Sequence, residues 1–162
     1  ALKDKTDLIV LSCHWGILEH ESAIGDYQRE AARALIDAGV DLIVSQGPLP
    51  IKGFETYKGK AIFYNLGKFA MISPWSRAET PTGISSPMLG ETARGLAVSA
   101  SFAADGITAV KLVPVYLGES GRPRILSPGD QWFDDILAVV RERTEAAGLN
   151  GEVDSEGGVS LT

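Results

Sequence analysis

Residues 7–16, DLIVLSCHWG, are the stretch that decides the fold we expect. Residues 8–11 form a continuous run of large aliphatic side chains, which is typical of a strand covered on both faces in a parallel or mixed sheet. An amphipathic segment follows at 26–38, and residues 41–44, DLIV, form a second apolar strand. Strand, helix and strand with short connections predict a βαβ unit.

The expected helix over 26–38 has recognisable ends and one apolar face. Asp26 is of a residue type that caps helix N-termini, and Gly39 stands where a C-terminal glycine is common. The apolar positions fall at helical spacing on a single side. They are Tyr27, Ala31, Ala34, Leu35 and Ala38.

Two hairpins are expected after the βαβ unit. Residues 53–57 and 61–66 flank the turn Lys58-Gly59-Lys60, and residues 96–102 and 107–117 flank a second turn. Between the hairpins, residues 73–92 are rich in Ser, Thr, Pro and Gly and predict a long irregular loop.

A last helix should run from a cap at Asp130 to about Ala147, before Gly148. Its buried face should carry Trp132, Phe133, Ile136, Leu137 and Val140. The polar tail at 149–162 should hold at most one short strand, at 159–161. We therefore expect an α/β sandwich in which residues 1–148 belong to one domain.

Length and composition fit one soluble-type domain. The chain has 162 residues, of which 44% are apolar and 22% charged. Its formal net charge is -6, and no basic run stands out, which argues against a nucleic-acid partner. No apolar run approaches the roughly 20 residues that a membrane-spanning helix needs.

Two segments should meet beyond the carboxyl ends of the strands, where ligands of α/β sheets bind. They are residues 12–16 and 45–50. In the first, His14 offers a transition-metal ligand or a proton shuttle, although a histidine hydrogen-bonded at a strand end is the alternative. Cys13 is more consistent with a small buried side chain than with a nucleophile, because neighbours on a strand point to opposite faces. In the second, Gln46 offers hydrogen bonds to a ligand but no strong metal ligand.

Glu19 and His20 form a polar cluster in the segment after the first strand. A role in binding substrate or metal is one interpretation, and a solvated loop is the other. Several common catalytic motifs do not occur in the sequence: the Gly-x-Ser-x-Gly elbow, the P-loop and the Gly-x-Gly-x-x-Gly loop.

These motifs together resemble a known family. The stretches that carry the resemblance are DLIVLSCHWG at 7–16, DYQRE at 26–30, LIDAGVDLIV at 35–44 and GFETYKGKAIFYNLG at 53–67. They are similar to the capsule-synthesis CapA/PgsA family. That resemblance implies a link to poly-γ-glutamate synthesis and a fold like that of calcineurin-like metallophosphoesterases. The chain then corresponds to about the C-terminal half of the sandwich, which an N-terminal half or another chain would complete.

The resemblance also implies a divalent metal, Mn, Fe or Zn, with His14 as a ligand. Two departures bear on that metal. Residues 45–49 read SQGPL where the family has Gly-His-His-Pro-His, and residues 66–69 read LGKF where the family has Leu-Gly-Asn-Phe. Losing these imidazoles should weaken a metal site, because Gln and Leu do not replace them.

The gain of a lysine at position 68 suggests a different chemistry. If Lys68 points into the former metal pocket, its ammonium would bind an anionic group; a solvated lysine at a strand end is the alternative. Three functions stay open. The first is a metal-dependent hydrolase that acts on a phosphoester, an amide or a polymer substrate. The second is a catalytically degenerate protein that binds an anionic polymer, a small molecule or a partner protein, and the third is a structural subunit whose exposed half-sandwich pairs with another chain.

Overall fold

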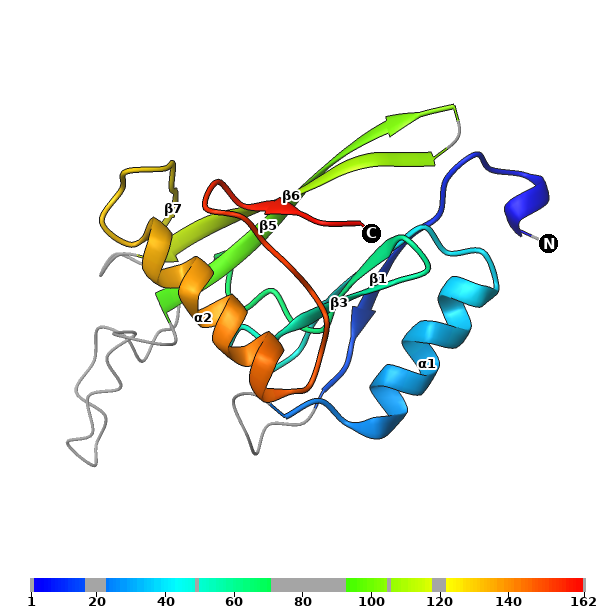
Figure 1. The fold of residues 1–162 in the computed structure, drawn as a ribbon, viewed down its shortest axis with the longest axis horizontal. Coiled ribbons are helices and arrows are strands. Elements are labelled where there is room, and N and C mark those ends of the chain that lie inside the picture. Colours follow the sequence, from blue (N-terminus) through cyan, green and yellow to red (C-terminus); the bar gives the residue numbers. More distant parts are fainter. Residues whose placement is uncertain are drawn as a thin grey trace.

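The computed structural model describes residues 2–16, 23–48, 50–70, 93–104, 106–117 and 122–161. These residues form two four-stranded sheets and two α-helices (Figure 1). The predicted α/β class, with a βαβ unit, two hairpins and a C-terminal helix, is confirmed. The loop predicted at 73–92 lies outside the described residues. Within the described ranges, no helix is long and apolar enough to cross a membrane.

The first sheet contains the predicted βαβ unit and the first hairpin. β1 (Val10–His14) and β2 (Leu42–Gln46) are parallel, and α1 (Asp26–Asp37) connects them. β3 (Phe54–Tyr57) and β4 (Lys60–Phe63) form the hairpin, and β4 lies parallel to β2. The strand order β1-β2-β4-β3 places β1 at an edge of this sheet.

The position of β1 corrects the expectation that this strand is covered on both faces. Leu11 and Cys13 pack against the cluster beneath α1, whereas Val10, Ser12 and His14 are exposed. Val10 is 47% exposed despite its aliphatic side chain. The alternating exposure along β1 shows that only the face toward α1 is covered among the described residues, and the apolar run alone could not reveal this.

The N-terminus of α1 also differs from the expected one. Gly25, not Asp26, is the N-cap residue, and the side chain of Gln28 accepts a hydrogen bond from its backbone N–H at 3.0 Å. Asp26 is instead the first helical residue, where a carboxylate favours the positive end of the helix. At the other end, Gly39 has a φ of 105°, which confirms it as the glycine that ends the helix.

The apolar face expected for α1 is wrong in part. The buried residues are Gln28, Ala32 and Ile36, whereas Tyr27 is 54% exposed. Alanines contribute little apolar area, so they did not locate the face, and a glutamine at its centre hid it from a hydrophobic pattern.

The second sheet is antiparallel. β5 (Arg94–Ala103) and β6 (Gly106–Leu117) form the second hairpin, and β7 (Pro123–Ile125) pairs with the end of β6. The tail contributes β8 (Gly158–Val159), which also pairs with β6. A short 3₁₀ helix, η1 (Leu2–Asp4), precedes β1.

The last helix, α2 (Phe133–Ala146), begins later than its expected cap. Trp132 is the N-cap residue, and the carboxylate of Asp130 accepts a hydrogen bond from the Ser127 N–H at 2.7 Å. Asp130 therefore stabilises the turn before the helix rather than the helix end itself. The predicted residues Phe133, Ile136, Leu137 and Val140 are all buried, and Trp132 is half-buried.

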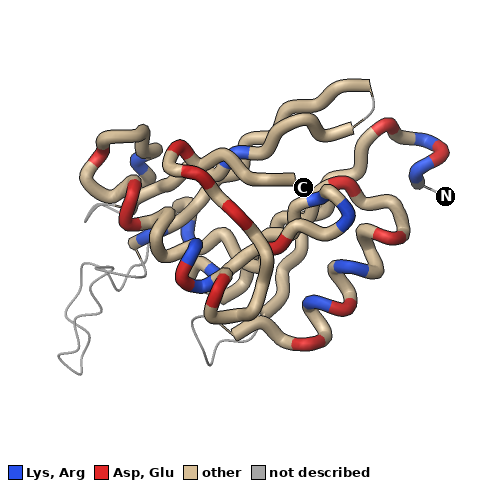
Figure 2. The backbone as a smooth tube through the Cα atoms, in the orientation of Figure 1, with Lys and Arg blue, Asp and Glu red and all other residues tan. Residues whose placement is uncertain are grey.

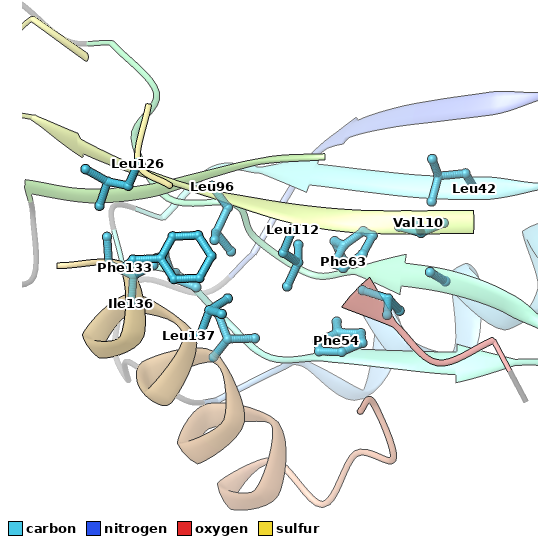
Figure 3. Close-up of a cluster of buried hydrophobic side chains, with 14 residues drawn as sticks. Leu42, Phe54, Phe63, Leu96, Val110, Leu112, Leu126, Phe133, Ile136 and Leu137 are labelled. Carbon is cyan, nitrogen blue, oxygen red and sulfur yellow. The ribbon is translucent and has the colours of Figure 1, made fainter. Parts of the chain in front are cut away.

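Two apolar clusters hold these elements together. The larger one lies between the first sheet, the second sheet and α2, and we call it the main core (Figure 3). The smaller cluster fills the space between the first sheet and α1. The main core contains Leu42, Ile51, Phe54, Ala61, Phe63, Leu96, Val110, Leu112, Leu126, Phe133, Ile136, Leu137, Val140 and Val159.

Candidate functional site

The carboxyl ends of β1 and β2 lie side by side, as the sequence predicts. His14 is the direct register partner of Gln46, and Cys13 is the partner of Ser45. The pairing continues one residue further, because the Trp15 N–H donates to the Gln46 carbonyl at 2.9 Å. His14 and Gln46 are therefore held next to each other by the parallel ladder itself.

Cys13 and His14 belong to opposite faces of the sheet. Cys13 packs against the cluster beneath α1, and burial raises the pKa of its thiol. His14 is exposed together with Ser12 on the other face. This arrangement favours the interpretation of Cys13 as a packing residue, because a nucleophilic thiol needs a lowered pKa and a nearby base.

A small cavity of about 120 Å³ opens next to these strand ends. Ser12 and Gln46 provide hydrogen-bonding groups in its wall, and Leu66, Phe69 and Leu96 provide apolar groups. Val44, Ser45 and Gly67 complete the lining. Such a cavity fits a small polar group that is attached to an apolar stem.

The segment at 66–68 joins the two sheets beside this cavity. The Leu96 N–H donates to the Leu66 carbonyl at 2.8 Å, and Gly67 forms an antiparallel bridge with Gly95. Lys68 follows at once and is half-buried, and burial lowers the pKa of its ammonium. Gly67 and Phe69 line the cavity, whereas Lys68 stands next to it.

Asn65 organises the loop that follows Gln46. Its side-chain amide donates to the carbonyls of Pro48 and Pro50, the latter at 2.6 Å. Asn65 is 1% exposed. The sequence analysis includes Ser12 in the candidate segment 12–16 without a role of its own, and it selects neither Asn65 nor Phe69 for this site. The only signal for Asn65 was its place in the stretch GFETYKGKAIFYNLG.

The described residues do not fit a Mn, Fe or Zn centre. Beside His14 stand an amide and a hydroxyl, those of Gln46 and Ser12, and neither is a strong transition-metal ligand. Across the described ranges, no three His, Cys, Asp or Glu side chains gather closely enough to hold a metal ion. The two further predicted residues, Glu19 and His20, lie outside those ranges.

The arrangement of the two sheets indicates the class of protein. A parallel βαβ unit, extended by an antiparallel hairpin and packed on a second, antiparallel sheet, is part of an α/β sandwich of the metallophosphoesterase-like type.

Comparison with known proteins finds similarity to one family in the N-terminal region of the chain. Residues 1–73 match the family described as bacterial capsule synthesis protein PGA_cap. The PGA biosynthesis protein CapA of Bacillus subtilis (strain 168) is 41% identical over 75 residues, which are 46% of this chain and 20% of that protein. The capsule biosynthesis protein CapA of Bacillus anthracis is 38% identical over 77 residues, 48% of this chain and 18% of that protein.

Over this N-terminal region the chain is similar to proteins of the CapA/PgsA family, in agreement with the resemblance read from the sequence. The alignments with these curated relatives span about a fifth of each relative's length.

Proposed function

We propose that this chain is part of a protein of bacterial capsule synthesis, and that its site binds poly-γ-glutamate without a complete catalytic metal centre of its own. The match of residues 1–73 to the capsule synthesis family supports the first part. The observation that carries the second part is the register pair His14–Gln46. The imidazole has an amide as its direct neighbour, and an amide recognises ligands through hydrogen bonds.

The chemistry of the polymer matches the groups around the cavity. Poly-γ-glutamate offers a carboxylate, a peptide amide and two methylene groups in every repeat. Gln46 donates and accepts hydrogen bonds, so it pairs with an amide, and the hydroxyl of Ser12 adds a donor for a carboxylate. Phe69 and Leu96 provide an apolar wall for the methylene groups.

Lys68 supplies the positive charge that a polyanion requires. The chain carries a net charge of -6, which repels a polycarboxylate at long range. Binding therefore depends on a short-range ammonium–carboxylate contact, and Lys68 is the lysine that adjoins the cavity wall between Gly67 and Phe69. We expect affinity to fall as salt rises, because dissolved ions screen such contacts.

The hydrolase alternative requires metal ligands from outside the described residues. No observation at the cavity favours hydrolysis over binding. His14 is not in the cavity wall but is the register partner of the wall residue Gln46, so we assign it to hydrogen bonding with the ligand at the rim.

Binding of poly-γ-glutamate to the full-length polypeptide that contains this sequence tests the proposal. Calorimetric titration should show saturable binding. Gln46→Ala and Lys68→Ala should each weaken it at least several-fold, and chelator treatment should leave it unchanged. Lys111→Ala is the matched control, because Lys111 is an exposed lysine on β6 outside the cavity lining.

Two results would contradict this assignment. If the wild type, Gln46→Ala and Lys68→Ala bind poly-γ-glutamate with equal affinity, the cavity does not bind the polymer. Stoichiometric Mn, Fe or Zn that is lost in His14→Ala, together with cleavage of the polymer, would establish the hydrolase instead.

We further propose that the rest of the same polypeptide continues both sheets. β1 has a neighbour on one side only among the described strands, and β5 pairs beyond β6 only through Gly95 and its neighbours. Unpaired edges readily accept further strands. Hydrogen exchange on the full-length polypeptide tests this: slow exchange at every amide of β1 is expected, and fast exchange at alternate amides would refute it.

A further inference from the structure

Buried polar atoms without partners occur where the carboxyl ends of β1 and β2 meet the first turn of α1. In the described part of the chain, the buried side-chain atoms that lack a hydrogen-bond partner are Trp15 Nε1, Gln28 Nε2, Ser45 Oγ and Asn65 Oδ1. Asn65 Oδ1 is an acceptor, whereas the other three atoms can donate. We call Trp15, Gln28 and Ser45 the donor cluster. Trp15 follows β1, Ser45 lies in β2, and Gln28 lies in the first turn of α1.

Gln28 ties this cluster to the N-terminus of α1. Its side chain is 0% exposed, and its Oε1 accepts the Gly25 N–H at 3.0 Å, so the amide group lies against the first turn. The other amide atom, Nε2, faces the segment after β1, 3.7 Å from the point where a Cβ on Gly16 would stand. Two N–H donors of this amide are therefore buried at the helix terminus without an acceptor.

Trp15 and Ser45 reach the same region from the sheet. Trp15 packs with the cluster beneath α1 and meets the ring of Tyr27 edge-on, with centroids 6.5 Å apart. Ser45 is 1% exposed, and its register partner is Cys13, which packs in the apolar cluster beneath α1. Both side chains thus occupy the α1 face at the carboxyl ends of their strands.

The chemistry of these groups selects an acceptor. An indole N–H and an amide NH₂ only donate, and a hydroxyl can donate as well. The N-terminus of the 12-residue α1 adds a positive potential, and the ammonium of Lys52 donates to the carbonyl of Ala23, two residues before Gly25. A buried donor without an acceptor destabilises the fold, so a ligand that accepts from several of these donors is strongly favoured.

We propose that the donor cluster is a buried site for one carboxylate or a comparable small oxyanion. Helix N-termini with converging N–H groups bind such ions. Asp26 is the carboxylate of the first turn, but its side chain is exposed and does not fill the site. Ser45 also belongs to the lining of the cavity beside His14, whereas Trp15 and Gln28 do not, so substitutions of Trp15 and Gln28 test the anion site separately from polymer binding.

The indole resonance of Trp15 reports directly on this site. The full-length polypeptide, labelled with ¹⁵N, is titrated with sodium acetate and then with sodium phosphate at constant ionic strength. We expect a saturable shift of the Trp15 indole signal and a rise in melting temperature with the anion that binds. The Trp132 indole is the internal control, because Trp132 Nε1 is not among the unpartnered buried atoms.

Two substitutions separate specific binding from general salt effects. Trp15→Phe removes one donor and keeps most of the ring. Gln28→Glu keeps an acceptor for the Gly25 N–H but replaces the other donor with negative charge. Both should reduce affinity for the anion at least tenfold, whereas Trp132→Phe should not change it. Gln28→Glu preserves the helix cap, so it decides the question even if Trp15→Phe does not fold.

Three results would overturn the proposal. An indole signal that ignores both anions and exchanges magnetisation with solvent would show a buried water. The same anion-dependent shift in Gln28→Glu would show a general effect of the medium. A signal that responds to neither anions nor solvent would show that another group of the polypeptide fills the site.

Discussion

The two halves of the molecule are built differently inside. Among the residues that the structure describes, those between 2 and 70 bury many polar and charged side chains, whereas those between 93 and 161 bury almost entirely apolar ones. The buried polar residues described in the first half are Gln28, Asp41, Ser45, Lys52, Glu55, Thr56 and Asn65, and those described in the second half are Arg143 and Thr144. The charges on the outside do not separate the halves in this way, since Lys and Arg alternate with Asp and Glu along α1 (Figure 2).

The difference between a polar and an apolar interior is a reason why the family match covers only the first half. Buried polar groups need partners in particular directions, so few substitutions preserve them. An apolar core accepts many combinations of side chains of suitable volume. The match to the capsule synthesis family covers residues 1–73, the half with the polar interior. The second half needs only an apolar pattern to pack on it.

The largest effect should come from removing a side chain of the main core that serves both halves. Phe133 is 1% exposed, and Phe133→Ala should cost about 3–5 kcal/mol of unfolding free energy, measured by chemical denaturation. Phe102, on β5 in the same half, is 50% exposed and provides the control, with an expected change within about 0.5 kcal/mol. Separate unfolding transitions for the two halves would contradict a shared core.

The seam between the halves should be the next most sensitive place. A Cβ on Gly95 would overlap the carbonyl oxygen of Lys68, so Gly95→Ala must push the two sheets apart. We expect a loss of about 2–3 kcal/mol, and the exposed Ser99→Ala on the same strand should have little effect. A neutral Gly95→Ala would show that the bridge with Gly67 does not hold the halves together.

The fold was predictable where apolar spacing alone determines it. The two hairpins, the βαβ unit and the buried face of α2 all follow from runs of large apolar residues. The face of α1 did not, because its centre is Gln28. The edge position of β1 did not either, since strand order depends on contacts that are distant along the chain.

Part of the candidate site was predictable from the sequence, and part was not. The meeting of His14 and Gln46 was predictable, because parallel strands end at one edge of their sheet. The roles of Asn65 and Ser12 depend on loop geometry and on which face of the strand is open. The placement of Lys68 inside the site was a prediction, and the structure sets this residue beside the cavity rather than in its wall.

Glu55 tests whether the polar interior stabilises the first half. Arg33 donates to its carboxylate at 2.6 Å and the Tyr64 hydroxyl at 2.7 Å, while Glu55 itself is 2% exposed. Glu55→Gln should lower the free energy of unfolding, measured by chemical denaturation, by about 2 kcal/mol. This loss is smaller than is usual for a buried ion pair because the Arg33 side chain is 43% exposed. Asp37→Asn is the control: it breaks the exposed pair with Lys58 and should leave stability nearly unchanged. Equal losses would mean that burial does not distinguish the two pairs.

Asp41 should give the first half a dependence on acid. Burial raises the pKa of this carboxyl, but hydrogen bonds from Lys3, Lys60 and the Ile9 N–H outweigh burial and hold the pKa at about 2. Because the folded pKa lies below the unfolded value near 3.8, the stabilisation is present above that value and is lost as the pH falls toward 2.

Asp41→Asn should therefore cost about 2 kcal/mol at pH 7 and progressively less as the pH falls from 4 to 2. Denaturation midpoints measured across that range check the prediction, with the variant following a flatter curve than the wild type. Parallel curves would mean that Lys3 and Lys60 do not lower the pKa of Asp41 in the folded protein. In that case the ion pairs of Asp41 with Lys3 and Lys60 would contribute to stability through packing alone, like the apolar contacts of the second half. The polar groups that distinguish the first half would then be Gln28, Glu55 and the residues around the site.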